Sequence, residues 1–277
     1  MQTLKLPSGQ TIPVLGLGTW QMGEHAKNRQ SEIDALRHGL DLGFSLIDTA
    51  EMYGEGGAES VIAEAIAQRR AEVFLVSKVY PQNASRQGAI AACERSLKRL
   101  KTDYLDLYLL HWRGAVPLAE TLAAFQTLQQ AGKIRSYGVS NFDAEDMEEA
   151  SQLQGGQAIA TNQVLYNLMR RGIEWDLLPW CRQQGLPIMA YSPIEQGRLL
   201  RHRTLQAIAQ DRGVTAAQVA IAWLLHQDNV IVIPKSSQID HVEQNRAALD
   251  LKLSAEELAI LDVAFPPPTQ AVALEML

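Results

Sequence analysis

Four titratable residues of complementary chemistry follow three apolar runs in the first half of the chain. Asp48 ends one run, and Tyr53 lies five residues further on in a turn rich in glycine. Lys78 ends the next run, and His111 directly follows the one after it. An acid, a phenol, a cation and an imidazole can together donate a proton to a carbonyl oxygen. We call these four residues the tetrad.

Each member of the tetrad has a distinct role in such a proton donation. Tyr53 would be the acid, although its unperturbed pKa of about 10 makes it a weak one. The charge of Lys78 is expected to lower that pKa, and Asp48 would hold Lys78 in place. His111 would donate a hydrogen bond to the carbonyl oxygen and orient it. Because these groups cannot reduce a carbonyl, the hydride must come from a cofactor.

Eight apolar runs, each followed by a helical pattern, must position these residues. Strands buried on both faces read as unbroken apolar runs, which is typical of a parallel sheet. The pattern predicts a closed (β/α)8 TIM barrel, in which the C-terminal strand ends converge on the active site. A doubly wound open sheet is the second possibility. The predicted strands are residues 15–20, 45–48, 73–78, 104–110, 134–139, 159–161, 187–190 and 230–233.

The alternation of strands and helices shows no domain boundary, so residues 1–277 are expected to form a single domain. Residues 1–14 carry a Pro-Ser-Gly turn and predict a β-hairpin. Residues 15–265 would form the barrel with extra helices near its end, and residues 266–277 form a tail without periodicity. Expected helix caps are Ser85, Asp143, Asp240 and the capping box Ser254–Glu257, with Pro117 at a first helical position.

Composition excludes several classes of partner. The net charge of −6 argues against nucleic acid and against an anionic membrane surface. No run of 18 apolar residues predicts a membrane span, and the first residues lack a secretion signal. The two cysteines lie far apart, which suits a reducing cytoplasm, and the histidines lack metal-site spacing. We expect a cytoplasmic monomer without a metal ion.

The remaining strand ends carry groups that suit a nicotinamide cofactor. Asn141 and Gln163 could pair with its carboxamide, and the ring of Tyr191 could stack on it. Lys235 with Ser236 offers a cation and a hydroxyl for a phosphate. The basic loop with Arg198, Arg201 and Arg203 could clamp a pyrophosphate or could simply be solvated. The walls of the substrate pocket would be Trp20, Met52 and Trp112.

Five stretches in the same order resemble the aldo-keto reductase family over nearly the whole chain. They are residues 15–20, 43–53, 97–112, 132–142 and 233–236. The resemblance implies an NADPH-dependent reductase of aldehydes and ketones with Tyr53 as the acid. The sequence from Asp48 to Tyr53 is similar to that of bacterial methylglyoxal and 2,5-diketo-D-gluconate reductases. The cofactor contacts that the resemblance implies are Thr19, Trp20, Ser140, Asn141, Gln163, Tyr191, Ser192, Lys235, Ser236, His241 and Asn245.

The chain departs from the family pattern at three places. Many members carry Arg where His241 stands, which leaves NADH as a possible cofactor. The turn 54–57 reads Gly-Glu-Gly-Gly, and Arg113 stands where Pro is frequent. The short stretch after Trp112 predicts a pocket that is open on that side. Two other functions stay open from the residues alone, namely a nicotinamide-binding regulatory module with little turnover and a Schiff-base aldolase using Lys78.

Overall fold

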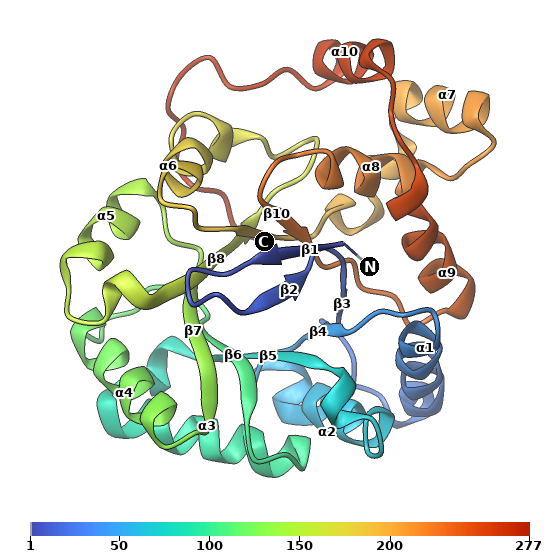
Figure 1. Ribbon diagram of the computed structural model, residues 1–277. Coiled ribbons are helices and arrows are strands. Elements are labelled where there is room, and N and C mark those ends of the chain that lie inside the picture. Colours follow the sequence, from blue (N-terminus) through green and yellow to red (C-terminus); the bar gives the residue numbers. More distant parts are fainter. Residues whose placement is uncertain (1) are drawn as a thin grey trace.

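An eight-stranded parallel sheet forms the centre of the protein in a computed structural model that describes residues 2–277 (Figure 1). Neighbouring strands follow chain order from β3 to β10. Two further parallel bridges, Leu15 with Val232 and Gly18 with Lys235, join the first strand to the last. The closed barrel is therefore confirmed and the open sheet is excluded. The strands are β3 (Gly16–Gly18), β4 (Leu46–Asp48), β5 (Phe74–Val79), β6 (Leu105–Leu110), β7 (Ile134–Ser140), β8 (Ile159–Leu165), β9 (Ile188–Tyr191) and β10 (Val230–Val232).

The strands are unbroken apolar runs because both of their faces are buried. Along β6, Leu107 and Leu109 belong to the cluster inside the barrel, whereas Tyr108 and Leu110 belong to the cluster beneath the helices. Successive side chains of a strand point to opposite faces, so both faces require apolar residues. The ring of helices in Figure 1 supplies the outer partner.

Eight of the helices follow strands around the barrel, and two are additional. The additional helices are α7, between β9 and α8, and α10, after α9, and these two pack against each other (Figure 1). The helices are α1 (Arg29–Asp41), α2 (Gly57–Ala65), α3 (Arg86–Leu100), α4 (Leu118–Gln130), α5 (Ala144–Gln152), α6 (Leu177–Gln183), α7 (Arg203–Arg212), α8 (Ala216–Leu225), α9 (Ile239–Ala247) and α10 (Ala255–Ala264).

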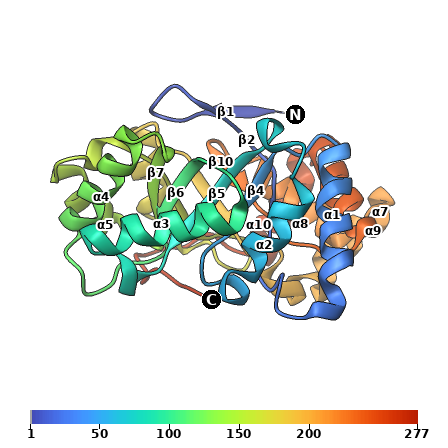
Figure 2. The ribbon, with the colours of Figure 1, turned by 90° about the horizontal axis from the view of Figure 1, so that it is seen from below.

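The predicted hairpin forms from β1 (Thr3–Lys5) and β2 (Thr11–Pro13). Leu6 and Ile12 are buried in the cluster that fills the barrel interior. Figure 2 shows the hairpin on one side of the barrel and the end of the chain on the other. The hairpin thus closes the N-terminal end of the barrel and leaves the opposite end for a site.

Most of the expected caps are present. Ser85 accepts a hydrogen bond from the Gly88 backbone, and Asp143 and Ser254 form capping boxes. The cap expected at Asp240 is wrong, because α9 starts one residue earlier, at Ile239, and Gln238 holds the cap position without a side-chain bond. Pro117 likewise stands at the cap of α4 rather than inside its first turn.

One strand boundary differs in a way that matters for the site. The sixth barrel strand was expected to end at Thr161 but continues to Leu165. Polar residues are tolerated there because their amides are satisfied: Asn162 donates to the Phe142 carbonyl at 2.8 Å and Gln163 donates to Asp48 at 2.8 Å. Gln163 is therefore fixed by a strand and not by a loop.

None of the helices within residues 2–277 is long and apolar enough to cross a bilayer.

Candidate active site

The C-terminal ends of the strands open into a cavity of about 570 Å³, which we call the active cavity. This end of the barrel lies opposite the hairpin (Figure 2). Fourteen of the predicted site residues line the cavity, and they come from β8, from α9 and from the ends of all the other barrel strands except β5. They are Thr19, Trp20, Asp48, Met52, Tyr53, His111, Trp112, Ser140, Asn141, Gln163, Tyr191, Ser192, Lys235 and His241.

Lys78 lies beneath the cavity floor and is fully buried. Its ammonium group donates to Asp48 Oδ2 at 2.7 Å and to the Thr49 carbonyl at 2.8 Å. The other carboxylate oxygen of Asp48 accepts from Gln163 Nε2 at 2.8 Å. A buried ion pair persists only when its geometry is good and its remaining atoms are hydrogen-bonded, and both conditions hold here. The Schiff-base alternative fails on this geometry, because Lys78 does not reach the cavity surface.

The Tyr53 hydroxyl lies directly above Lys78. Its oxygen is 3.4 Å from Lys78 Nζ, and that nitrogen is 5.0 Å from the centre of the Tyr53 ring. Tyr53 opens the short 3-10 turn Tyr53–Gly56 that follows β4. The Tyr53 phenol therefore lines the cavity, and the Lys78 cation lies beneath it.

The unusual sequence of the turn after Tyr53 has a structural cause. Gly54, Glu55 and Gly56 all have positive φ angles, of 57°, 53° and 88°. A Cβ added at Gly54 would lie 2.9 Å from the Met22 carbonyl oxygen, and one at Gly57 would lie 2.4 Å from that of Gly23. The turn therefore needs glycine both for its backbone conformation and for its close contact with the loop after β3.

His111 follows β6 and packs between two aromatic rings. Its ring centre is 5.7 Å from that of Tyr53, in an edge-to-face arrangement, and 4.9 Å from that of Trp112. Burial and the charge of Lys78 lower the pKa of His111 to about 2. The imidazole is therefore neutral at physiological pH, with one N–H available as a donor.

Burial, together with the charge of Asp48, raises the pKa of Tyr53 well above its usual value. The expectation that Lys78 lowers this pKa is wrong for the protein alone. Burial and the Asp48 carboxylate outweigh the Lys78 cation at the phenol, while the same carboxylate opposes the lowering of the Lys78 pKa by burial. The phenol consequently keeps its proton over the neutral and mildly alkaline range.

Polar groups that could bind a carboxamide lie beside the tetrad. Asn141 has a left-handed backbone, with φ of 59°, and its side chain donates to the His111 carbonyl at 3.0 Å. Tyr191 donates to the Asn141 amide oxygen at 3.0 Å. Since the Gln163 nitrogen donates to both Asp48 Oδ1 and Met189 Sδ, only the amide oxygen of Gln163 is left for a ligand.

Lys235 and His241 also line the active cavity. Lys235 is partly buried, which lowers its pKa, while the charges of Glu32 and Glu24 oppose this shift. Two predicted cofactor residues are not among the cavity residues: the Ser236 hydroxyl bonds to the backbone of Gln238, and Asn245 is buried on α9.

The basic loop is not brought to the active cavity. Arg198 pairs with Glu195 at 2.9 Å, and Arg201 and Arg203 are exposed. None of the three residues lines the cavity. Arg113 is also directed to surface partners, since it pairs with Asp146 and Glu149 on α5.

The sequence indicated that the loops at residues 194–203 and 266–277 shape the pocket, but it predicted no individual site residue in either. Residues 193–200 contribute Ile194, Gln196 and Leu200, and the end of the described chain contributes Met276 and Leu277. Apolar residues at the end of an aperiodic tail were the only signal available. The tail folds back over the barrel mouth, where Met276 and Leu277 line the active cavity.

A closed (β/α)8 barrel with a buried Lys–Asp pair beneath a tyrosine and a neutral histidine defines a class of carbonyl-reducing enzymes. Residues 14–264 match the sequence profile of the aldo/keto reductase family. The chain belongs to this family and is an enzyme of the aldo-keto reductase class, as the motifs predicted.

Three relatives show how near the similarity is. The chain is 55% identical to the methylglyoxal reductase YeaE of Escherichia coli (strain K12), over 96% of this chain and 95% of the relative. It is 34% identical to the glyoxal reductase of Bacillus subtilis (strain 168), over 94% and 91% of the two chains. An aldo/keto reductase from Klebsiella pneumoniae, solved in complex with NADP and acetate, superposes with a TM-score of 0.97 at 52% identity and covers 99% of each chain.

Proposed function

We propose that this enzyme reduces small aldehydes and α-dicarbonyls, such as methylglyoxal, to alcohols with NADPH. The observation that carries the proposal is the Tyr53 hydroxyl, which faces the active cavity 3.4 Å from the buried Lys78 ammonium. The 55% identity to a methylglyoxal reductase supports the substrate class.

The cavity residues fit a nicotinamide cofactor in their chemistry. Amide and hydroxyl groups of Ser140, Asn141 and Gln163 gather near the tetrad, and the Tyr191 ring lies beside them. Lys235 supplies a cation for a phosphate, and His241 also lines the cavity. The cavity volume of about 570 Å³ is within the usual range for small-molecule and cofactor sites. NADPH, when bound, supplies the hydride.

The tetrad supplies the proton and orients the carbonyl. His111, which is neutral, donates its N–H to the carbonyl oxygen and fixes its direction. Tyr53 then transfers its hydroxyl proton to the same oxygen as negative charge develops there. The Lys78 ammonium stabilises the resulting phenolate, and Asp48 keeps Lys78 within reach. General acid catalysis of this kind contributes about 10²–10⁴ in rate.

The substrate end of the cavity favours small, uncharged molecules. Its walls are Trp20, Met52, Trp112, Met276 and Leu277, whose side chains carry no charge. Arg113, the basic residue next to Trp112, is occupied by two carboxylates on α5. A carboxylate-bearing sugar acid would therefore find no free cation from this side.

The test is a substrate screen with the purified protein. Methylglyoxal and short aldehydes should oxidise NADPH, and Tyr53→Phe should abolish most of that activity. Equal rates for the wild type and Tyr53→Phe would contradict the proposal. Tight NADPH binding with no turnover over the whole panel would instead support the regulatory module.

NADPH and NADH should be compared in the same screen. His241 replaces an arginine of many family members, so Lys235 is the main cation for a 2′-phosphate. We expect a preference for NADPH with residual use of NADH.

A further inference from the structure

The buried carboxylate of Glu195 fixes a loop that lines the active cavity. Glu195 is fully buried and accepts from Asn167 at 2.9 Å, from Arg170 at 2.9 and 3.1 Å, and from Arg198 at 2.9 Å. Its neighbours Ile194 and Gln196 line the active cavity. We call residues 192–198 the cavity loop.

The cavity loop needs these contacts because its backbone is strained. Ser192, Glu195 and Gln196 have φ angles of 49°, 50° and 53°, in the left-handed region that side chains other than glycine disfavour. Such conformations persist only where surrounding contacts impose them. Asn167 adds one such contact by donating to the Ser192 carbonyl at 2.9 Å. The hydrogen bonds of Glu195 and Asn167 therefore hold the loop in one conformation, and the loop should leave that conformation if they are lost.

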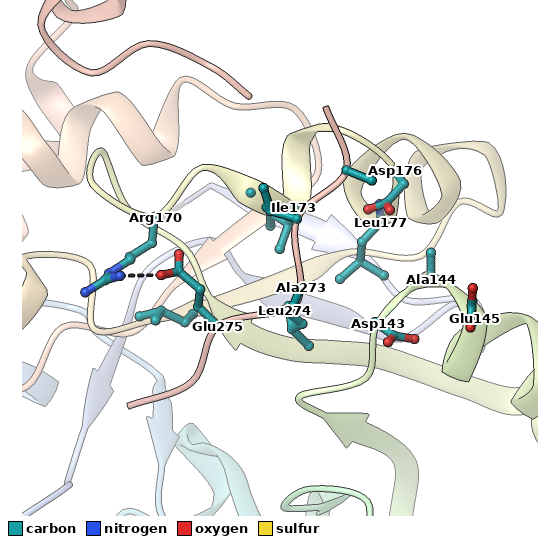
Figure 3. Close-up of a pocket in the computed structure, with 14 residues that line it drawn as sticks. Asp143, Ala144, Glu145, Arg170, Ile173, Asp176, Leu177, Ala273, Leu274 and Glu275 are labelled. Atoms are coloured by element: carbon teal, nitrogen blue, oxygen red, sulfur yellow. Dashed lines mark hydrogen bonds and ion pairs between the residues drawn. The ribbon is translucent and has the colours of Figure 1, made fainter. Parts of the chain in front are cut away.

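Arg170 connects this loop to the segment 271–277, which we call the strap. The guanidinium group of Arg170 bonds to Glu195 through Nε and Nη2, and its remaining nitrogen, Nη1, bonds to Glu275 of the strap. Figure 3 shows the Arg170–Glu275 pair at one end of a cavity beneath the strap. One side chain thus contacts both the cavity loop and the strap.

The strap is only loosely supported elsewhere. It crosses a second cavity, of about 250 Å³, lined on its other side by Asp143, Ile173 and Leu177 (Figure 3). Leu274 is partly buried against the core, whereas Val272 and Met276 are exposed. Segments with few buried contacts open most readily, so the Glu275 pair is one of the contacts that hold the strap in place.

We infer that Arg170 is a positioning residue that couples the cavity loop to the strap, so that cofactor bound against the loop orders the substrate wall formed by Met276 and Leu277. The coupling rests on the proposed binding of NADPH in the active cavity. Because linkage between two sites is reciprocal, a fixed strap must in turn strengthen NADPH binding by the same factor.

Glu275→Gln tests the coupling without disturbing the buried end of the network. Glu275 is exposed on the strap, and its replacement leaves Arg170 paired with Glu195. Asp262→Asn is the matched control, because it removes a comparably exposed carboxylate from the neighbouring Arg171 and touches neither loop nor strap. Hydrogen–deuterium exchange of peptides from the strap and the loop is measured with and without NADPH. NADPH binding itself is followed separately by fluorescence.

In the wild type and in Asp262→Asn, NADPH should slow exchange in both the loop and the strap. In Glu275→Gln, it should slow exchange in the loop only, and NADPH affinity should fall about two- to fivefold, as expected for an exposed ion pair. The KM for the carbonyl substrate should rise with little change in kcat.

Two results would overturn the coupling. One is a strap that NADPH protects equally in Glu275→Gln and the wild type, which would mean direct contact with the cofactor. The other is a strap that does not respond to bound NADPH in the wild type. Absence of NADPH binding in the fluorescence measurement would instead refute the proposed function.

Discussion

The Lys78 ammonium nitrogen lies 3.4 Å from the Tyr53 hydroxyl oxygen, and no exposed route leads to Lys78 from the active cavity. In the proposed mechanism the cation would act on the substrate only through the phenol. This relationship would allow a tyrosine with a raised pKa to serve as an acid. The phenolate that forms on proton transfer would be created next to a charge already in place.

Removal of Lys78 should destabilise the fold more than removal of the whole buried pair. Lys78→Met leaves the Asp48 carboxylate buried without a counter-charge, which costs about 3–5 kcal/mol. The double variant Lys78→Met/Asp48→Asn should recover part of that loss, because no buried charge remains. Urea unfolding of the two variants measures the difference. A double variant that is less stable than Lys78→Met would contradict this account of the pair.

The protein should become less stable as pH falls, because His111 is held neutral in the folded state. Its folded pKa of about 2 lies below the usual value of about 6.5, so the unfolded chain binds the proton more readily. The stabilisation is fully present above about pH 6.5 and is lost as pH falls toward 2. Between pH 7 and pH 5 the wild type should lose up to about 2 kcal/mol relative to His111→Phe. Equal pH dependence in both proteins would show that His111 is not held neutral.

The lowered pKa of His111 and the raised pKa of Tyr53 together predict that activity does not change with pH near neutrality. His111 is already neutral and Tyr53 is still protonated between pH 6 and 9, so neither group should titrate in kcat/KM over that range. Reduction should fall only where Tyr53 loses its proton, above its usual pKa of about 10. A fall in kcat/KM centred near pH 7 and absent from Tyr53→Phe would contradict the raised pKa.

Lys235 and His241 should set the preference between the two nicotinamide cofactors. Lys235→Met should weaken NADPH binding about 10-fold or more, because a hydrogen bond to a charged group contributes about 1.5–3 kcal/mol, and should affect NADH little. His241→Arg should strengthen NADPH binding, since a second permanent cation would face the same end of the cavity. Fluorescence titration with both cofactors measures each effect. Equal loss of NADPH and NADH binding in Lys235→Met would show that Lys235 does not contact the 2′-phosphate.

Gly54→Ala should reduce activity by displacing Tyr53. The new Cβ would lie 2.9 Å from the Met22 carbonyl oxygen at a position with a φ of 57°. Gly9→Ala is the matched control, because Gly9 also has a positive φ, of 83°, but no atom within 4 Å of the added Cβ. Both variants carry a backbone penalty of about 1–2 kcal/mol. Only Gly54→Ala should lower kcat. Steady-state assays of the two variants, at a temperature where both are folded, measure the difference.

The barrel could be predicted because its strands are buried on both faces. Continuous apolar runs such as those of β5 and β6 leave few alternatives, and the polar residue after each run marks the end where a site forms. The placement of Asp48, Tyr53 and His111 followed from this pattern.

The cavity loop and the strap could not be predicted in the same way. The loop has no periodicity, and its shape depends on the burial of Glu195, a residue type that is usually exposed. The strap is held by Arg170, more than a hundred residues earlier in the chain. The predicted lowering of the Tyr53 pKa was wrong for a related reason. The sequence reveals the neighbouring cation but not the depth of burial that opposes its effect.

The central claim is that Tyr53 is the proton donor in carbonyl reduction. Its most direct test compares wild type and Tyr53→Phe for NADPH binding by fluorescence and for methylglyoxal reduction in single-turnover assays. The account predicts unchanged NADPH affinity and a loss of about 10²–10⁴ in the rate of reduction. A Tyr53→Phe variant that binds NADPH and reduces methylglyoxal at the wild-type rate would contradict it.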